Sequence, residues 1–388
     1  KQLGLKRICF AKGICKCGMP VQYWRKHIEK IKKEANQKNI GIIIYDEIKE
    51  TDIASEVQDF TSNITISDKG TKVNEIKTPQ ILQSTTETIT TEDEQVDYTS
   101  SNINKYFYNQ LDKYSKIIYN ALDENKENMK SGTYEINLGT EFSDVLSNAN
   151  GQNELGDYYQ TAIEAYSYDN PDVFYIDFQK LYLNIETTTR GTKKTYKVFL
   201  NSGNSQNYLE SQFQTKESVD TALNEIQKIR AYFVQNKKQD TYQNIKLVHD
   251  YLVETIDYDQ STSRTNTYNL YGALVEKNCV CEGYAKAFKY LMDGLNIPCT
   301  IVAGNGTNSE GVTESHAWNY VQLNGIWYAV GVTWDDPILV GGGILTNSSK
   351  YKYFLKGASE FNTSHVSDGQ FTEGGKIFSY PELSEQNY

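Results

Sequence analysis

Several features that define whole classes of protein are scarce in this sequence. Its 388 residues contain six cysteines, too few for a disulfide scaffold, and no apolar run long enough to cross a bilayer. No signal peptide is visible, and residues 41–45 form only a short apolar stretch. The net charge of −11 argues against nucleic acid as a general partner. We therefore expect a soluble, acidic protein without a transmembrane segment.

The charge is unevenly distributed along the chain. Residues 1–45 carry eleven basic and two acidic side chains, a net +9, which leaves −20 for the remainder. This segment is either a basic arm for an anionic surface, such as an acidic polymer or a membrane, or a poorly ordered terminus. Its three cysteines, Cys9, Cys15 and Cys17, match no common zinc pattern in their spacing and stay unassigned.

Composition and apolar spacing divide the rest of the chain into three parts. Residues 46–104 are rich in Ser, Thr, Asp and Glu and are predicted to be a disordered acidic linker, with a peripheral strand near residues 64–66 as the alternative. Residues 105–239 are predicted to be a mixed α/β region, followed by a core over residues 240–388. The expected elements include strands at 173–176, 181–186 and 195–200, and helices at 209–236 and 241–255.

Cys281 stands at the start of a predicted helix. Apolar residues recur at helical spacing from 284 to 295, and Gly294, Asn296 and Pro298 end the pattern. The unpaired N–H groups and the dipole at a helix start favour a thiolate over a thiol, and the thiolate is the nucleophilic form. The alternative is that Cys281 is a small, buried apolar residue, as most free cysteines are.

His316 lies on the first strand of a predicted β-hairpin. Asn324-Gly325 separates two strand-like runs, 317–323 and 326–330, which is typical of a two-residue type I′ turn. In that register Leu323 pairs with Ile326, and His316 would face Thr333 if the ladder continues that far. Residues 331 and 335 would then be the diagonal neighbours of His316 on the same face of the sheet.

Three motifs in this region carry a resemblance to a known family. They are Cys281-Glu282-Gly283-Tyr284-Ala285, His316-Ala317-Trp318-Asn319 and Thr333-Trp334-Asp335-Asp336-Pro337. With residues 247–252 upstream and 351–357 downstream, the segment resembles the bacterial branch of the transglutaminase-like superfamily. The resemblance implies an α+β, papain-like core in which a helix carrying Cys281 packs on an antiparallel sheet carrying His316. It also implies that Cys281 is the nucleophile and His316 its base.

The sequence departs from the family at the third catalytic position. Members usually have an aspartate that orients the histidine, four places before the first Asp of the Trp-Asp-Asp-Pro motif, and here that residue is Gly331. Loss of such an acid can cost several orders of magnitude in rate. Asp335 is a candidate substitute, although an Asp-Asp-Pro run is also an ordinary turn. If Gly331 is a lost orienting position, Gly331→Asp should raise turnover.

Four further residues have less specific predicted roles. Trp318 and Trp334 either wall a substrate cleft or pack in the core, and His249 and His365 are expected to be structural. The implied chemistry is acyl transfer on protein or peptide amides, as a transglutaminase, deamidase or protease. It requires no metal or organic cofactor.

The alternative function is a non-catalytic binding module that keeps the cleft without the orienting acid. An extracellular or cell-surface setting is expected for either function, with the cytoplasm as the other possibility.

Overall fold

The computed structural model describes residues 65–67, 81–85, 96–190, 192–203, 205–261, 264–340, 347–371 and 375–388. The chain divides into two compact units, residues 1–67 with 337–349, and residues 68–336 with 350–388. The predicted basic arm at 1–45, with Cys9, Cys15 and Cys17, lies outside the described residues. Of the predicted linker, the structure describes two strands and residues 96–104. The first strand, β1 (Thr65–Ser67), pairs antiparallel with β11 (Ile338–Val340) in the smaller unit.

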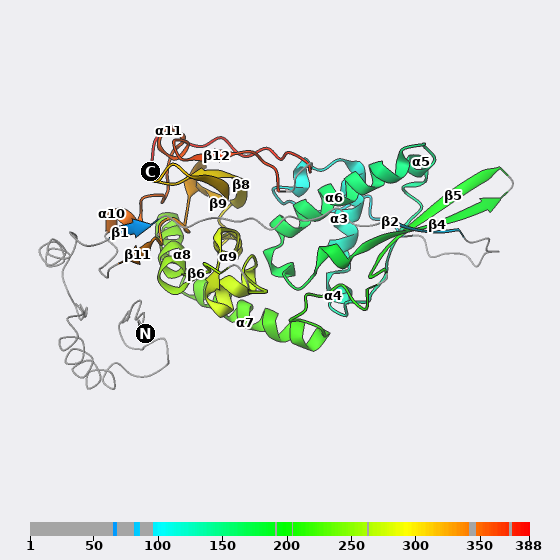
Figure 1. The fold of residues 1–388 in the computed structure, drawn as a ribbon, viewed down its shortest axis with the longest axis horizontal. Coiled ribbons are helices and arrows are strands. Elements are labelled where there is room, and N and C mark those ends of the chain that lie inside the picture. Colours follow the sequence, from blue (N-terminus) through cyan, green and yellow to red (C-terminus); the bar gives the residue numbers. More distant parts are fainter. Residues whose placement is uncertain are drawn as a thin grey trace, which may run out of the picture. The chain divides into compact units, whose positions relative to one another are not determined.

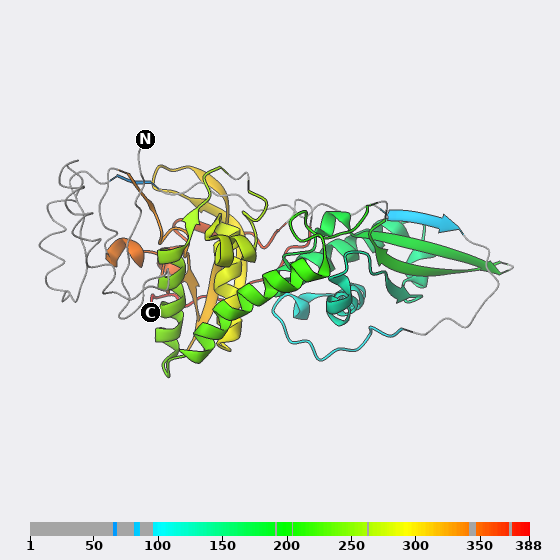
Figure 2. The same cartoon turned by 90° about the horizontal axis from the view of Figure 1, so that it is seen from below.

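The first part of the larger unit packs helices beside a four-stranded sheet. The sheet has the order β2-β4-β5-β3, with β2 (Ile81–Thr85), β3 (Ile136–Gly139), β4 (Tyr182–Arg190) and β5 (Lys193–Asn201). Its helices are η2 (Tyr108–Gln110), α3 (Lys113–Glu124), α4 (Lys126–Met129), α5 (Ser143–Leu146), α6 (Gly151–Asp169), η3 (Pro171–Val173) and η4 (Phe178–Lys180). The long β4–β5 hairpin confirms the two strands predicted at 181–186 and 195–200 (Figure 2).

One predicted strand in this part is wrong. Residues 173–176 form no strand: Val173 ends the 3₁₀ turn η3, which Pro171 begins, residues 174–175 are a turn, and only Ile176 makes an isolated bridge to Leu209. Pro171 fixes a helical φ at the start of the turn, and the short apolar run then buries itself without strand pairing. Short apolar runs of this kind fit either a strand or a buried turn, so periodicity does not separate them.

Helices α7 (Lys216–Gln235), α8 (Thr241–Thr255) and α9 (Cys281–Gly294) follow. Thr215 and Ser218 form a capping box at the start of α7, and the Asp240 side chain accepts from the Tyr242 amide at the start of α8. Between α8 and α9 lie β6 (Asp257–Tyr258), the π-helical turn η5 (Gly272–Glu276) and β7 (Asn278–Cys279), with β6 and β7 paired in parallel.

The second sheet has the order β10-β9-β8-β12 and includes the predicted hairpin. Its strands are β8 (Cys299–Thr307), β9 (Thr313–Leu323), β10 (Ile326–Val330) and β12 (His365–Ser367). Asn324 and Gly325 both have positive φ, 55° and 81°, as a type I′ turn requires. The predicted register is confirmed from Ile326–Leu323 to Val330–Asn319.

Beyond Val330 the predicted register is wrong. The amides of Trp334 and Asp335 both donate to the carbonyl of Gly331, at 3.1 Å each, so the chain winds into a turn instead of continuing the strand. His316 therefore pairs with Gly304 of β8 and has no partner at Thr333. The diagonal geometry that was expected to bring residue 335 beside His316 does not form.

Two layers cover the second sheet, one on each face. On one face the Asn319 side chain donates to the Ala285 carbonyl of α9 at 3.0 Å, and α8 lies next to α9 (Figure 1). The other face holds a buried cluster that the C-terminal segment completes, with α11 (Ala358–Phe361) and β12 nearby. We call it the aromatic cluster; its members are Val302, Trp318, Tyr320, Ala329, Trp334, Tyr353 and Phe361. The α+β architecture, with a Cys281 helix on an antiparallel sheet, is confirmed.

Candidate functional site

Cys281 is the first residue of α9, as the sequence predicts. The preceding residue, Val280, is extended, and its amide donates to the Thr267 carbonyl at 3.0 Å. A Cβ on Gly283 would lie 2.6 Å from the Cys279 Cβ, so only glycine lets β7 pack this closely on the first turn. The Cys281 side chain is fully buried. Its position at the positive end of the helix dipole favours the thiolate.

His316 is held in a ring-lined environment on β9. Its imidazole is fully buried and stacks on Trp334 with 4.8 Å between ring centroids, while His365 lies 5.4 Å away. Within the part of the chain that the structure describes, neither ring nitrogen has a hydrogen-bond partner. Burial lowers the pKa of His316 to about 3, so the imidazole is neutral at pH 7. A neutral imidazole can accept a proton at its unprotonated nitrogen, but a pKa of about 3 makes His316 a weak base while it stays in this packing.

The thiol and the imidazole belong to adjoining layers but do not form a hydrogen bond. Side chains alternate along a strand, and Asn319 marks the face of β9 that meets α9. His316 has the opposite parity and packs with Trp334 on the other face. The structure thus brings the helix of Cys281 and the strand of His316 together, while the imidazole stays in the aromatic layer.

Asp335 is hydrogen-bonded to a different histidine, His249. The Nε2 of His249, on α8, donates to Asp335 Oδ2 at 3.0 Å, and the Tyr353 amide donates to Oδ1 at 2.7 Å. Burial raises the pKa of Asp335 to about 6, although the His249 hydrogen bond opposes the rise. Asp335 therefore orients His249 in this structure, and no hydrogen bond supports the role toward His316 that the sequence suggested for it.

His249 is a fully partnered buried histidine. Its Nδ1 donates to Asp250 Oδ1 at 3.2 Å, so both ring nitrogens face carboxylates. Burial lowers its pKa, but the hydrogen bonds to Asp250 and Asp335 outweigh burial and leave the pKa raised above its ordinary value. The structural role expected for His249 fits this arrangement. Its partner Asp335 lies 86 residues further along the chain, a separation at which local sequence patterns carry no signal.

The space that an acid at position 331 would need is filled by aromatic rings. A Cβ on Gly331 would lie 3.0 Å from the Tyr353 Cβ and 3.7 Å from a Phe361 ring atom. His365 stacks on Phe361 with 4.0 Å between centroids and completes this wall next to His316. His365 is a ring neighbour of His316, and Tyr353 and Phe361 pack on His365. The sequence analysis did not place these three residues there, because they come from the C-terminal segment.

Trp318 and Trp334 are both buried in the aromatic cluster, which corresponds to the core alternative of their prediction. The Nε1 of Trp334, the Nε2 of His365 and both nitrogens of His316 are buried without hydrogen-bond partners. Buried polar atoms are nearly always paired in folded proteins, so unpaired ones in contacting rings need an explanation, and a catalytic role is one such explanation.

Comparison with known families identifies the domain. The family model described as the transglutaminase-like superfamily matches residues 227–332, which include Cys281 and His316. This chain carries a transglutaminase-like superfamily domain. No curated protein matches the chain.

Solved structures align with parts of the chain at low identity and low TM-score. A transglutaminase crystal structure aligns at 17% identity and a TM-score of 0.29, over 44% of this chain and 48% of the other. A candidate cysteine protease from Cytophaga hutchinsonii aligns at 10% identity and 0.24, over 41% and 68%. The periplasmic domain of TgpA from Pseudomonas aeruginosa aligns at 16% identity and 0.23, over 37% and 56%. The match spans about half the length of the first of these chains.

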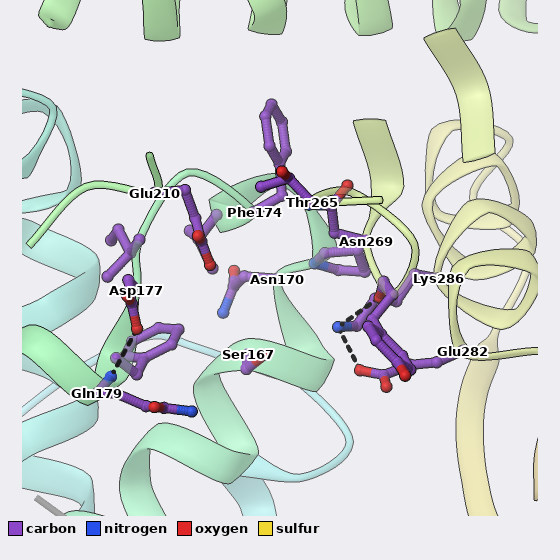
Figure 3. Close-up of a pocket in the computed structure, with 15 residues that line it drawn as sticks. Ser167, Asn170, Phe174, Asp177, Gln179, Glu210, Thr265, Asn269, Glu282 and Lys286 are labelled. Carbon is purple, nitrogen blue, oxygen red and sulfur yellow. Dashed lines mark hydrogen bonds and ion pairs between the residues drawn. The ribbon is translucent and has the colours of Figure 1, made fainter. Parts of the chain in front are cut away.

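A cavity lies beside the first turns of α9, lined by residues between 167 and 210 on one side and between 265 and 286 on the other. Its volume is about 270 Å³, and its lining includes Glu282, the residue after Cys281, and Lys286 one turn later. Figure 3 shows Glu282 and Lys286 on one side, with Glu210 and Asp177 on the other. Neither His316 nor the two tryptophans line this cavity.

The described residues contain neither a metal-binding cluster nor a membrane-spanning helix. Within those ranges, no group of three or more His, Cys, Asp and Glu side chains is placed to hold a metal ion. Over the same residues, no helix is both long and apolar enough to cross a membrane.

Proposed function

We propose that the transglutaminase-like domain catalyses thiol-dependent acyl transfer on protein or peptide amides, with Cys281 as nucleophile. The observation that carries the proposal is the position of Cys281 as the first residue of α9, where backbone N–H groups and the helix dipole stabilise a thiolate. His316 supplies a neutral imidazole on the adjoining sheet. The family match over residues 227–332 supports assigning these two roles.

The proposed reaction has two balanced steps. The Cys281 thiol gives its proton to His316, and the sulfur forms a bond to the amide carbonyl carbon. The His316 proton then passes to the departing amine as the C–N bond breaks, which leaves a thioester on Cys281. Water or a second amine attacks the thioester and restores the thiol. The Cys281 backbone N–H is a candidate donor to the oxyanion.

The proposal requires one rearrangement of the site. To reach the thiol, His316 must leave its stack with Trp334, and the backbone of β9 must also turn at residue 316, because its Cβ points away from the α9 face. Strand β10 stops pairing at Asn319, so no neighbouring strand covers β9 on that side beside His316. Breaking an aromatic stack costs about 0.5–1.5 kcal/mol, an amount that substrate binding can offset.

A non-catalytic binding module is the second candidate, and two observations favour it. Position 331 has no acid, and the nearby Asp335 is engaged by His249. Cys281 and His316 are also both fully buried. In this role the domain would keep the fold and a ligand cavity without turnover.

The two candidates differ in whether Cys281 forms a covalent acyl intermediate. The test is incubation of the folded protein with p-nitrophenyl acetate at pH 7.5, followed by intact-mass measurement and peptide mapping. The proposal predicts one acetyl group on Cys281, lost on addition of an amine. Cys281→Ala should take up none, and Cys299→Ala, which removes another buried thiol, should behave like the original protein. Absence of acetylated Cys281 would favour the binding module.

A further inference from the structure

The cavity beside α9 has an unbalanced charge. Three carboxylates line it, those of Asp177, Glu210 and Glu282, against the single ammonium of Lys286. That ammonium already forms an ion pair with Glu282 at 2.6 Å and donates to the Tyr268 carbonyl at 3.3 Å. The cavity therefore presents more negative than positive charge to whatever enters it.

Glu210 is the carboxylate that lacks a cation. In the part of the chain that the structure describes, no salt bridge reaches Glu210, whereas Asp177 has Lys180 at 2.9 Å. Burial and the neighbouring Asp177 raise the pKa of Glu210 to about 7, and Lys180 and Lys286 only partly oppose the rise. Figure 3 shows its carboxylate directed into the cavity.

The cavity's size and walls also restrict its ligand. A volume of about 270 Å³ lies just below the roughly 300–1,000 Å³ of ordinary small-molecule sites, so it suits one side chain better than a cofactor. Phe174 and Tyr268 contribute aromatic surface to the lining. Aromatic faces accept both the methylene stem and the charged head of a cationic side chain.

The cavity is connected to the proposed nucleophile through shared residues. Glu282 follows Cys281 on α9, and the Val280 amide is bonded to Thr267, next to Tyr268. Tyr268 and Glu282 both line the cavity, and burial raises the pKa of Tyr268, with the charges of Glu282 and Cys281 adding to the rise. A group bound in the cavity would thus lie close to an amide held at Cys281.

We propose that this cavity is a subsite for a cationic side chain, an ammonium or guanidinium group, of the peptide presented to Cys281, and that Glu210 is its main counter-charge. The inference rests on the proposed function in treating the bound peptide as a substrate, but cation binding itself does not require turnover. Entry of the cation gives Glu210 the partner that the folded chain does not supply.

Binding should depend on pH in a defined direction. The cation favours ionised Glu210, and a pKa of about 7 leaves that carboxyl about nine-tenths protonated at pH 6. Asp177, Glu282, Lys180 and Lys286 also face Glu210, and their charges do not need to change in this range for the effect to appear. Affinity should therefore rise by about tenfold between pH 6 and pH 8.

The experiment uses the full chain with Cys281→Ala, so that no turnover interferes, and isothermal titration with butylammonium, butylguanidinium and uncharged 1-pentanol. We expect either cation to bind at least about tenfold more tightly than 1-pentanol at pH 8, and Glu210→Gln to remove most of that preference and its pH dependence. Glu217→Gln, at an exposed site on α7, is the matched control and should change nothing. Thermal melts confirm that each variant is folded.

Equal binding of 1-pentanol and the cations, or unchanged cation affinity in Glu210→Gln, would overturn the inference. These outcomes are separate from failure of the proposed function. Cation binding without acetylation of Cys281 would contradict the proposed acyl transfer and support the cation subsite. Acetylation of Cys281 without cation preference would support acyl transfer and contradict the subsite.

Discussion

Two fully buried histidines lie in the same domain under opposite conditions. His249 donates both ring protons to carboxylates, Asp250 and Asp335, and its pKa is raised. His316 has rings on several sides, no hydrogen-bond partner on either nitrogen, and a pKa lowered by burial to about 3. Equal burial is thus accompanied by a pKa raised by two carboxylates at His249 and a pKa lowered by burial at His316.

The contrast separates residues that hold the fold from residues that are free to act. A buried polar group that is fully paired stabilises one conformation, and removing its partner is costly. A buried polar group left unpaired is a cost that the fold carries, and such costs concentrate at functional sites. By this reasoning Asp335 is important because it holds His249 in place, and it is a poor candidate for a role in the Cys281 site.

The largest expected effect is on chemistry at Cys281. Cys281→Ala should lower any acyl-transfer turnover by at least roughly 10³-fold, because no other group on α9 can form the thioester. Turnover is measured with an amide or ester donor and an amine acceptor. Burial raises the pKa of the Cys299 thiol, and the Cys299→Ala variant should keep its turnover. Equal losses in both variants would show that the effect is on folding.

The same substitution at both histidines should give opposite stability changes. His249→Phe leaves Asp335 buried without its partner and should cost about 3–5 kcal/mol of unfolding free energy. His316→Phe keeps a ring against Trp334 and removes two unpaired nitrogens, so its cost should stay within about 1 kcal/mol. Urea unfolding of both variants gives the comparison. A large loss in His316→Phe would mean that the His316 nitrogens have partners in solution.

The two histidines should also titrate on opposite sides of the ordinary range. His316 should show no ¹H–¹³C NMR titration between pH 5 and 8, because its pKa is depressed to about 3. His249 should lose its proton above its ordinary pKa of 6.5. A raised folded-state pKa means that the His249 contribution to stability is complete below pH 6.5 and is lost as the pH rises through the folded value. Titration of His316 near pH 6.5 would contradict its packing.

The smallest effect is expected at Gly331. Gly331→Ala should cost about 1 kcal/mol, since its Cβ meets the Tyr353 Cβ at 3.0 Å. Gly331→Asp should cost more and should not raise turnover, which revises the expectation from the sequence. Thermal melts and a turnover assay on both variants check this. Increased turnover in Gly331→Asp would show that Tyr353 moves aside and that the position still orients His316.

The features that could be predicted from the sequence are those that depend on local residue patterns. The start of α9 at Cys281 follows from helical apolar spacing, and the β9–β10 register follows from the Asn324-Gly325 turn. The sequence could not show that the ladder ends at Val330, because the turn at 331–335 is fixed by Tyr353 and His249 from distant segments. Extrapolating the register past its end is what placed Asp335 beside His316.

The central claim is that His316 serves as the base for Cys281 despite its aromatic surroundings. The most direct measurement is the rate of iodoacetamide alkylation of Cys281 at pH 7, located by peptide mapping, in the original protein and in His316→Phe. Both proteins bury the thiol alike, so the ratio isolates the imidazole. The account predicts that labelling slows at least about tenfold in His316→Phe; equal rates would contradict it.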